Sequence, residues 1–415
     1  MILPEIKDIE LAHKRLKNVV IQSPLTKSIN LSNDFNSNIY FKREDLQTVR
    51  SFKIRGAYNK LSTLSKKESE KGIVCASAGN HAQGVALSCN LLNIKGKIYM
   101  PATTTTQKIS SVKRFGKDNV EIVLIGDTFD DSFAEAMKDC TENKKTFIHP
   151  FDDDKVIEGQ ATVGLEIFKE IDEKIDYIFL PIGGGGLAAG VSSYFKQISP
   201  ETKIIGVEPK GASSMIEAIK QGEPTTLDEI DKFVDGAAVK RVGKLNFEIC
   251  QKTLDDIISI PEGEICTNLL KLYNEEGVIV EPTGALAVSA LNYYRDKIKN
   301  KNVVCIISGG NNDIARMAEI NERAILYNKL KHYFIVQFPQ RSGALKEFLN
   351  NVLGEDDDIC LFEYTKKTNR ENGPALIGIE LKRREDFEPL INRMKEYKIN
   401  YRLVNDNLDL YNILV

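Results

Sequence analysis

The sequence predicts an α/β protein with a mostly parallel sheet covered by helices, followed by a second, smaller domain. Two observations carry this prediction. From about residue 39 to residue 310, short β-branched runs alternate with longer stretches of helical periodicity. Near residues 325–333 this pattern ends, and the remaining chain follows the order strand, helix, strand, strand, helix, strand. Continuous apolar strands separated by helices are typical of parallel sheets buried on both faces.

The elements of the first part follow from these runs. We expect strands at residues 39–42, 73–76, 98–100, 120–125, 177–182, 203–208 and 303–308. We expect helices at residues 52–65, 81–92, 106–115, 129–141, 157–170, 187–197 and 264–276. Open α/β sheets bind ligands beyond the carboxyl ends of their strands, so the loops that leave these strands are candidate site residues.

The last part of the chain forms a second predicted domain. A polar helix ends near residues 328–329, and strands are expected at 333–338, 359–365, 375–380 and 401–404. Helices are expected at 344–353 and 384–397, with a turn at 369–374. This βαββαβ order is typical of a ferredoxin-like fold.

Composition and charge exclude several classes of protein. The chain has 415 residues, of which 42% are hydrophobic and 28% charged, with a net charge of −3. This balance gives no reason to expect a nucleic acid or a membrane as partner. The N-terminus carries Glu5, Asp8 and Glu10 and no apolar signal core, so we expect no export. Seven scattered cysteines favour reduced thiols in the cytoplasm over disulfides or a zinc site.

Lys53 is the first candidate catalytic residue. It follows Phe52 and precedes the small residues Gly56 and Ala57. An ordinary lysine is protonated and inert at neutral pH, so a nucleophilic lysine needs burial or a positive neighbour. We interpret Lys53 as a nucleophile and Phe52 as a residue that stacks on a cofactor ring. The alternatives are a solvated surface lysine and plain core packing of Phe52.

A run of four glycines is the second candidate. Gly183, Gly184, Gly185 and Gly186, followed by Leu187, leave one predicted strand and open a helix. Each glycine loses extra backbone entropy on folding, so four together suggest backbone N–H groups that close on an anion. The run lacks the Lys-Ser/Thr of a nucleoside-triphosphate loop and does not match the dinucleotide-binding glycine pattern. The alternative is a flexible turn.

Two polar loops complete the candidate site. The loop after the strand at 73–76 comprises Ser77, Ala78, Gly79, Asn80 and His81. Its hydroxyl, amide and backbone donors can hold a carboxylate or a ring oxygen of a cofactor. His81 is either a base or a hydrogen-bonded core imidazole. Ser308 closes the last strand, where its hydroxyl can meet a pyridine nitrogen or simply cap the chain.

Together these motifs resemble the fold-type II pyridoxal-phosphate enzymes, and within them the threonine (serine) dehydratases, over about residues 5–325. Further matching segments begin at Glu158, Gly206, Asp235 and Glu281. The resemblance implies a tryptophan synthase β-like fold of two open α/β subdomains. It also implies a catalytic domain at 1–328, with a small subdomain at about 45–150 inserted in the larger one.

The resemblance assigns roles to the candidate residues. Pyridoxal 5′-phosphate is the implied cofactor and Lys53 its Schiff-base lysine. The other implied cofactor contacts are Phe52, Asn80, Gly183, Gly184, Gly185, Gly186, Leu187 and Ser308, and the substrate carboxylate falls to residues 77–81. No metal is expected, because metal-binding relatives carry an acidic residue six positions after Glu208, where this chain has Ser214.

The implied activity is β-elimination that deaminates L-threonine to 2-oxobutanoate and ammonia, the first step of isoleucine biosynthesis. The open alternatives are a serine dehydratase or racemase, a β-replacement synthase such as cysteine synthase, and a catalytically silent amino-acid sensor.

Residues 329–415 resemble the ACT-like regulatory domain of biosynthetic threonine dehydratases, in a single copy. This likeness implies isoleucine as an inhibitor and valine as a candidate opposing effector. The predicted effector site lies at a strand-to-helix turn and contains Arg341, Gly343, Ala344 and Leu345. A lone copy of such a domain lacks a partner within the chain, so we expect a homodimer or homotetramer.

Overall fold

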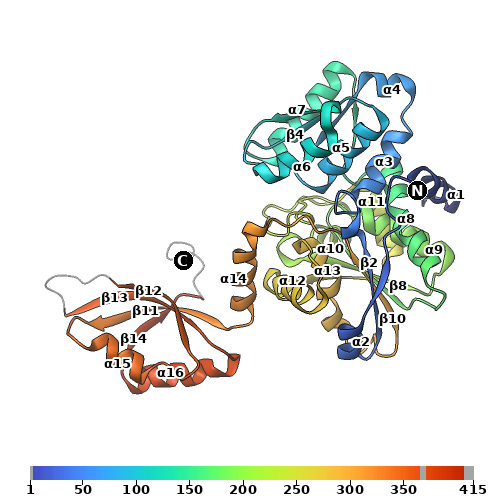
Figure 1. Cartoon of the computed structure of the whole chain (residues 1–415). Helices are drawn as coiled ribbons and strands as arrows, with labels where there is room; N and C mark the ends of the chain where they lie inside the picture. Colours follow the sequence, from blue (N-terminus) through green and yellow to red (C-terminus); the bar gives the residue numbers. More distant parts are fainter. Residues whose placement is uncertain (1–2, 365–370, 406–415) are drawn as a thin grey trace. The chain divides into compact units, whose positions relative to one another are not determined.

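The computed structural model describes residues 3–364 and 371–405 (Figure 1). The chain divides into two compact units, residues 1–316 and 317–415. The predicted boundary after residue 328 stays a prediction, and positions 369 and 370 of the predicted turn lie outside the described residues. Within the described part, no helix has the length and apolar character needed to cross a membrane.

The first unit contains a six-stranded sheet in the order β1-β2-β10-β7-β8-β9. These strands are β1 (Leu25–Ser28), β2 (Asn38–Arg43), β7 (Tyr177–Pro181), β8 (Lys203–Pro209), β9 (Asp256–Ile260) and β10 (Asn302–Ile307). Only the pairing of β1 with β2 is antiparallel among these strands. The four predicted strands of this sheet are confirmed, whereas β1 and β9 were not predicted.

Helices cover both faces of this sheet. They include α1 (Ile6–Leu16), α2 (Ile29–Phe35), α8 (Asp154–Glu170), α9 (Gly186–Ile198), α10 (Ser214–Gln221), α11 (Lys244–Thr253), α12 (Glu262–Glu276) and α13 (Pro282–Ser289). Alternate residues of β10 point to opposite faces. Val304 and Ile306 join the core formed with α8 and α9, while Cys305 Sγ lies 3.9 Å from the Ala287 carbonyl of α13. The predicted parallel sheet between helices is therefore confirmed.

A second, four-stranded parallel sheet lies within the predicted subdomain at 45–150, in the order β5-β4-β3-β6. Its strands are β3 (Ile73–Ala76), β4 (Gly96–Met100), β5 (Val120–Leu124) and β6 (Thr146–Phe147). Its helices are α3 (Lys53–Ser62), α4 (Lys66–Lys71), α5 (Asn80–Leu92), α6 (Thr106–Gly116) and α7 (Phe129–Asn143). Val85, Ile98 and Val112 belong to its buried core.

The second unit begins with α14 (Met317–Tyr327) and contains an antiparallel sheet in the order β12-β13-β11-β14. Its elements are β11 (Lys331–Pro339), α15 (Ala344–Asn351), β12 (Asp358–Tyr364), β13 (Asn372–Glu380), α16 (Phe387–Glu396) and β14 (Asn400–Leu403). Helices α15 and α16 lie along one face of this sheet (Figure 1), where Phe348 and Leu390 pack against Phe334 and Ile377. The predicted βαββαβ order is confirmed.

Candidate active site

Lys53 is the first residue of helix α3 and is partly buried within the first unit. Its Nζ donates a hydrogen bond to the Pro150 carbonyl at 2.8 Å and lies 5.3 Å from the ring centre of Phe52. Burial lowers the pKa of Lys53 to about 8, against the opposing pull of the Glu281 carboxylate. The structure therefore supplies the burial that an amine needs to react near neutral pH.

The glycine loop connects β7 to α9 and is shaped by its surroundings. Asn246 Nδ2 donates to the carbonyls of Gly184 and Phe151, at 2.8 and 3.0 Å, which fixes the direction of the loop. Gly185 has a φ of +92°, a conformation that favours glycine. A Cβ on Gly184 would collide with the Phe151 ring. The loop is held in one conformation and is not a flexible turn.

The donors of this loop are unused. Among the described residues, none accepts a hydrogen bond from the backbone N–H groups of residues 183–187. Four of these five residues are buried, and α9 begins at Gly186. Buried N–H groups without partners are rare in folded proteins, and those at a helix N-terminus attract anions. This loop fits a phosphate group.

The side chain of Asn80 is fixed by two neighbours at the start of α5. Its Nδ2 donates to Glu281 Oε1 at 2.7 Å, and its Oδ1 accepts from Asn311 Nδ2 at 2.6 Å. A primary amide has two donor hydrogens, so one N–H of Asn80 stays available. In the same loop, Ser77 Oγ accepts from the Gly79 N–H at 3.2 Å. The loop thus presents an oriented amide beside the first turn of a helix.

His81 was predicted to be either a base or a hydrogen-bonded core imidazole, and its surroundings in the structure match the core imidazole. Its Nε2 lies 2.9 Å from the Ile148 carbonyl, and the side chain is buried. Burial and the positive charge of Lys53 lower the pKa of His81 to about 3, so its imidazole is neutral. The ring is therefore a hydrogen-bonded core residue, and only the backbone of His81 is available for a carboxylate.

Ser308 follows the carboxyl end of β10 and is 1% exposed. Its Oγ has no hydrogen-bond partner within the described ranges. Its carbonyl accepts from the Phe52 N–H at 3.1 Å, which places Ser308 next to the residue that precedes Lys53. A buried hydroxyl without a hydrogen-bond partner is unfavourable, and a ring nitrogen of a ligand is a suitable partner for it.

Sequence reasoning missed Glu281, Phe151 and Asn246 as parts of the site. Glu281 is 5% exposed, and burial, reinforced by the charge of Asp235, raises its pKa to about 7. The available signal was the segment beginning at Glu281, which contributed to the family resemblance without being assigned a role. Phe151 and Asn246 carried no comparable motif.

Two other predicted features have identifiable surroundings. Glu208, buried at the end of β8, accepts from the backbone N–H groups of Met215 and Ile216 at 2.8 and 2.9 Å, so it caps α10.

In the second unit, Gly343 has a φ of +86° and precedes α15, while the exposed Arg341 pairs with Glu347 at 2.6 Å. Ala344 is buried and Leu345 is 40% exposed, and the effector role of this turn stays a prediction.

Comparison with known proteins gives a family match in each of the two units. Residues 16–309 match the family described as "Pyridoxal-phosphate dependent enzyme", and residues 322–414 match the "C-terminal regulatory domain of Threonine dehydratase". The chain is 57% identical over 411 residues to "L-threonine dehydratase biosynthetic IlvA" of Halalkalibacterium halodurans, covering 99% of both chains. It is 55% identical to the Bacillus subtilis protein of the same name, covering 100% of this chain and 98% of the relative. The chain belongs to the family of biosynthetic L-threonine dehydratases.

Solved structures agree with this family. The processed form of threonine deaminase isoform 2 from Solanum lycopersicum is 42% identical, with a TM-score of 0.73 over 78% of this chain and 95% of that one. Serine racemase from Dictyostelium discoideum is 30% identical, with a TM-score of 0.69 over 74% and 98% of the two chains. The predicted fold-type II architecture and its cofactor, pyridoxal phosphate, are thereby confirmed.

The residues present fit this cofactor. Unused N–H groups at residues 183–187 suit its phosphate, the unpartnered Ser308 hydroxyl suits its ring nitrogen, and Lys53 supplies the amine. Asn80 keeps one N–H for an oxygen of the ring. Each part of the cofactor therefore has a matching group.

Proposed function

We propose that this chain deaminates L-threonine to 2-oxobutanoate and ammonia, with Lys53 as its catalytic residue. The observation that carries the proposal joins two features. The Lys53 amine is bonded to the Pro150 carbonyl, and the neighbouring Phe151 packs against a glycine loop whose N–H groups have no acceptor among the described residues. Identity of 55–57% over the whole chain to proteins named L-threonine dehydratase supports threonine as the substrate.

Pyridoxal phosphate, when bound, would supply an electron sink for the substrate Cα–H and an acid, its phosphate, near the leaving hydroxyl. The N–H groups of residues 183–187 hold the phosphate, and Asn80 orients the ring. The loop at residues 77–81, which leads into α5, receives the substrate carboxylate through those of its backbone N–H groups that have no acceptor in the loop or sheet.

Lys53 moves the proton. With a pKa of about 8, part of its amine is unprotonated near neutral pH and can accept the Cα proton. Ser308 would offer the ring nitrogen a neutral hydroxyl in place of a carboxylate, and this partner would not keep the nitrogen protonated. Such a setting would weaken the electron sink that the cofactor supplies and would favour β-elimination over racemisation.

The second unit is the regulatory domain of this proposal. Isoleucine is the proposed inhibitor and valine the opposing effector, bound near the turn that contains Arg341 and Gly343. The lone βαββαβ unit pairs with its copy in a homodimer or homotetramer.

All seven cysteines are free thiols, which supports action in the reducing cytoplasm.

A coupled assay tests this function. Purified full-length protein is supplied with L-threonine or L-serine, and 2-oxo acid formation is followed with lactate dehydrogenase, with and without isoleucine. We expect turnover of threonine that isoleucine lowers, and we expect deletion of residues 330–415 to remove the isoleucine effect. Cofactor-loaded protein that forms no 2-oxobutanoate would overturn the proposed activity, and inhibition that survives the deletion would overturn the regulatory assignment.

A further inference from the structure

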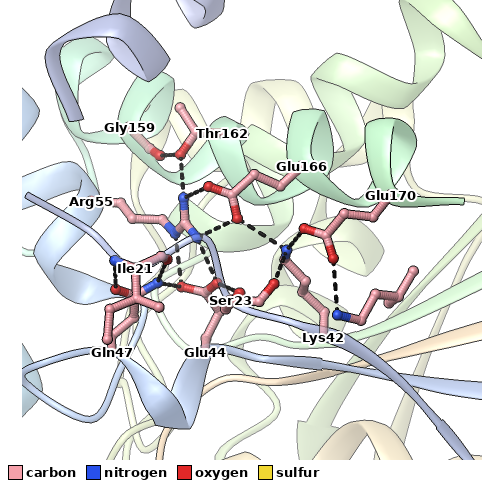
Figure 2. Close-up of polar contacts among 11 residues, drawn as sticks. Ile21, Ser23, Lys42, Glu44, Gln47, Arg55, Gly159, Thr162, Glu166 and Glu170 are labelled. Carbon is pink, nitrogen blue, oxygen red and sulfur yellow. Dashed lines mark hydrogen bonds and ion pairs between the residues drawn. The ribbon is translucent and has the colours of Figure 1, made fainter. Parts of the chain in front are cut away.

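A cluster of charged side chains lies buried beside the first turn of α3, two residues beyond Lys53 (Figure 2). The buried ionic cluster consists of Lys42, Glu44, Arg55, Glu166 and Glu170. Three of these side chains are fully buried and Glu166 is 2% exposed. The cluster joins β2, the turn that follows it, α3 and α8.

Arg55 lies at the centre of this cluster and uses every donor that it has. Its Nε and Nη2 donate to the two oxygens of Glu44 at 2.8 and 2.7 Å. Its Nη1 and Nη2 donate to the two oxygens of Glu166, both at 2.7 Å, and Nη1 also donates to Thr162 Oγ1 at 3.1 Å. These bonds use all five N–H groups of the guanidinium. Two bidentate pairs fix both the position and the plane of the Arg55 side chain.

The carboxylates are themselves held by other parts of the chain. Glu44 accepts from the Ser23 hydroxyl, and Glu166 accepts from Lys42 Nζ at 3.0 Å. Lys42 Nζ also donates to Glu170 at 2.6 Å and to the Ser23 carbonyl. Burial alone would raise the pKa of Glu166, but Arg55 and Lys42 hold it below its ordinary value. Glu166 is therefore ionised, and both carboxylates that pair with Arg55 are held by further groups.

The backbone of the same turn is held by close helix contacts. A Cβ on Gly159 of α8 would lie 2.6 Å from the Arg55 carbonyl oxygen and 2.6 Å from Gly56 Cα. A Cβ on Gly84 of α5 would lie 3.2 Å from the carbonyl carbon and oxygen of Lys53. Two helices thus touch the backbone that carries Lys53, and the buried ionic cluster fixes its next turn.

Stability alone is a poor explanation for this cluster. Removing two or more charges from water is costly, and well-packed apolar residues often replace buried ion pairs with no loss of stability. A fully satisfied buried network does, however, hold its members in one geometry. The charge of Arg55 is balanced by Glu44 and Glu166. The pKa of Lys53 is shifted by burial and by Glu281, so the charge of Arg55 is not among the causes of that shift.

We propose that Arg55 is a positioning residue, which fixes the first turn of α3 through Glu44 and Glu166 and so aims the Nζ of Lys53 at the cofactor site. The proposal rests on the proposed function of Lys53. It assigns Arg55 a geometric role, without contact with substrate or cofactor. A displacement of about 1 Å at a reacting group lowers a rate by about 100-fold, so a small loosening of this turn has a large effect.

The test compares Arg55 with Lys42, the other cation of the cluster. Arg55→Met and Lys42→Met each remove one buried cation that contacts Glu166, but only Arg55 belongs to α3. Both variants are expected to lose stability. In full-length protein freed of cofactor, acetylation of Lys53 is measured by mass spectrometry across pH. The rate of covalent attachment of added pyridoxal phosphate is measured by absorbance.

We expect the wild-type acetylation profile to have its midpoint at about pH 8. In Arg55→Met the midpoint moves toward 10.5, the ordinary value for lysine, as water reaches the amine, and cofactor attachment slows by at least about 10-fold. In Lys42→Met the midpoint stays and attachment changes by less than about 3-fold. Equal effects in both variants, or no effect of Arg55→Met, overturn the proposal.

Two further variants keep the test decisive if Arg55→Met does not fold. Arg55→Lys keeps the charge but loses the bidentate geometry, so a positioning role predicts slow attachment, and wild-type behaviour overturns it. Glu44→Gln neutralises one partner and breaks its bidentate pair with Arg55, so it should also slow attachment. Wild-type protein that turns over threonine while these variants behave normally refutes the role of Arg55 alone. Wild-type protein that binds no cofactor refutes the proposed function instead.

Discussion

Replacement of Gly184 by alanine is the sharpest test of the glycine loop. The added Cβ would fall on Phe151 ring atoms Cδ1, Cγ and Cε1, more than about 1 Å inside the separation at which carbon atoms normally pack. The ring has little room to retreat, because it packs edge-on against His149 with ring centres 4.7 Å apart. Asn246 also holds the Phe151 carbonyl. We therefore expect the loop to move.

The size of the effect follows from the geometry of hydrogen bonds. An N–H donor that lies about 2.8 Å from a phosphate oxygen is no longer bonded after a shift of about 1 Å. A hydrogen bond to a charged group contributes about 1.5–3 kcal/mol. Loss of one or two such bonds weakens binding by about 3 kcal/mol, which corresponds to an increase of about 100-fold in the Kd for pyridoxal phosphate.

The assay is a titration of full-length apoprotein with pyridoxal phosphate, followed by threonine turnover at saturating cofactor. Gly164→Ala is the matched control, since Gly164 lies inside α8 and its added Cβ would have ordinary contacts of 3.5 Å. We expect Gly184→Ala to raise the Kd far more than it lowers kcat, and the control to change neither. An unchanged Kd in Gly184→Ala would show that this loop does not hold the phosphate.

The remaining predictions concern single groups. Lys53→Ala should abolish threonine turnover and the absorbance of covalently bound cofactor. Its circular dichroism spectrum should match that of the wild type. Turnover near the wild-type rate would contradict the role of Lys53. Glu281 has a folded pKa of about 7 against an ordinary 4.5, so its protonation stabilises the folded apoprotein and this contribution falls as pH rises through that window. Glu281→Gln removes the dependence, so its unfolding temperature relative to wild type should rise from about pH 5 to about pH 8. Parallel profiles would show that Glu281 does not titrate in this way.

Elements with strong local patterns were predictable from the sequence. Strand β3 was placed at its observed bounds, and α5 and α9 were placed to within one residue at each end. Helix α13 was missed because every residue from Pro282 to Ser289 is buried, so the helix has no polar face and no amphipathic period. Strand β1 was missed because it is a four-residue edge strand with two exposed residues, which leaves little apolar signal.

The residues of the candidate site were likewise predictable only where they lie in a local sequence pattern. Lys53, Asn80, the glycine loop and Ser308 were found because each lies in a short motif at the end of a strand or the start of a helix. Contacts across long stretches of chain leave no such signal. Asn246 bonds to a loop 62 residues away, and Arg55 bonds to Glu166, 111 residues away. Only the fold brings these partners together.

The buried ionic cluster and the candidate cofactor site differ in whether their polar groups have hydrogen-bond partners. At Arg55 every donor has an acceptor, and such a network resists any movement that would leave a buried charge unpaired. At residues 183–187 and at Ser308, buried donors have no acceptor among the described residues, an arrangement that is unfavourable until a ligand provides one. Lys53 lies between the two. Its backbone belongs to the turn that the ionic cluster holds, and its amine is bonded to the Pro150 carbonyl, so the geometry of the reacting amine is fixed before the cofactor binds.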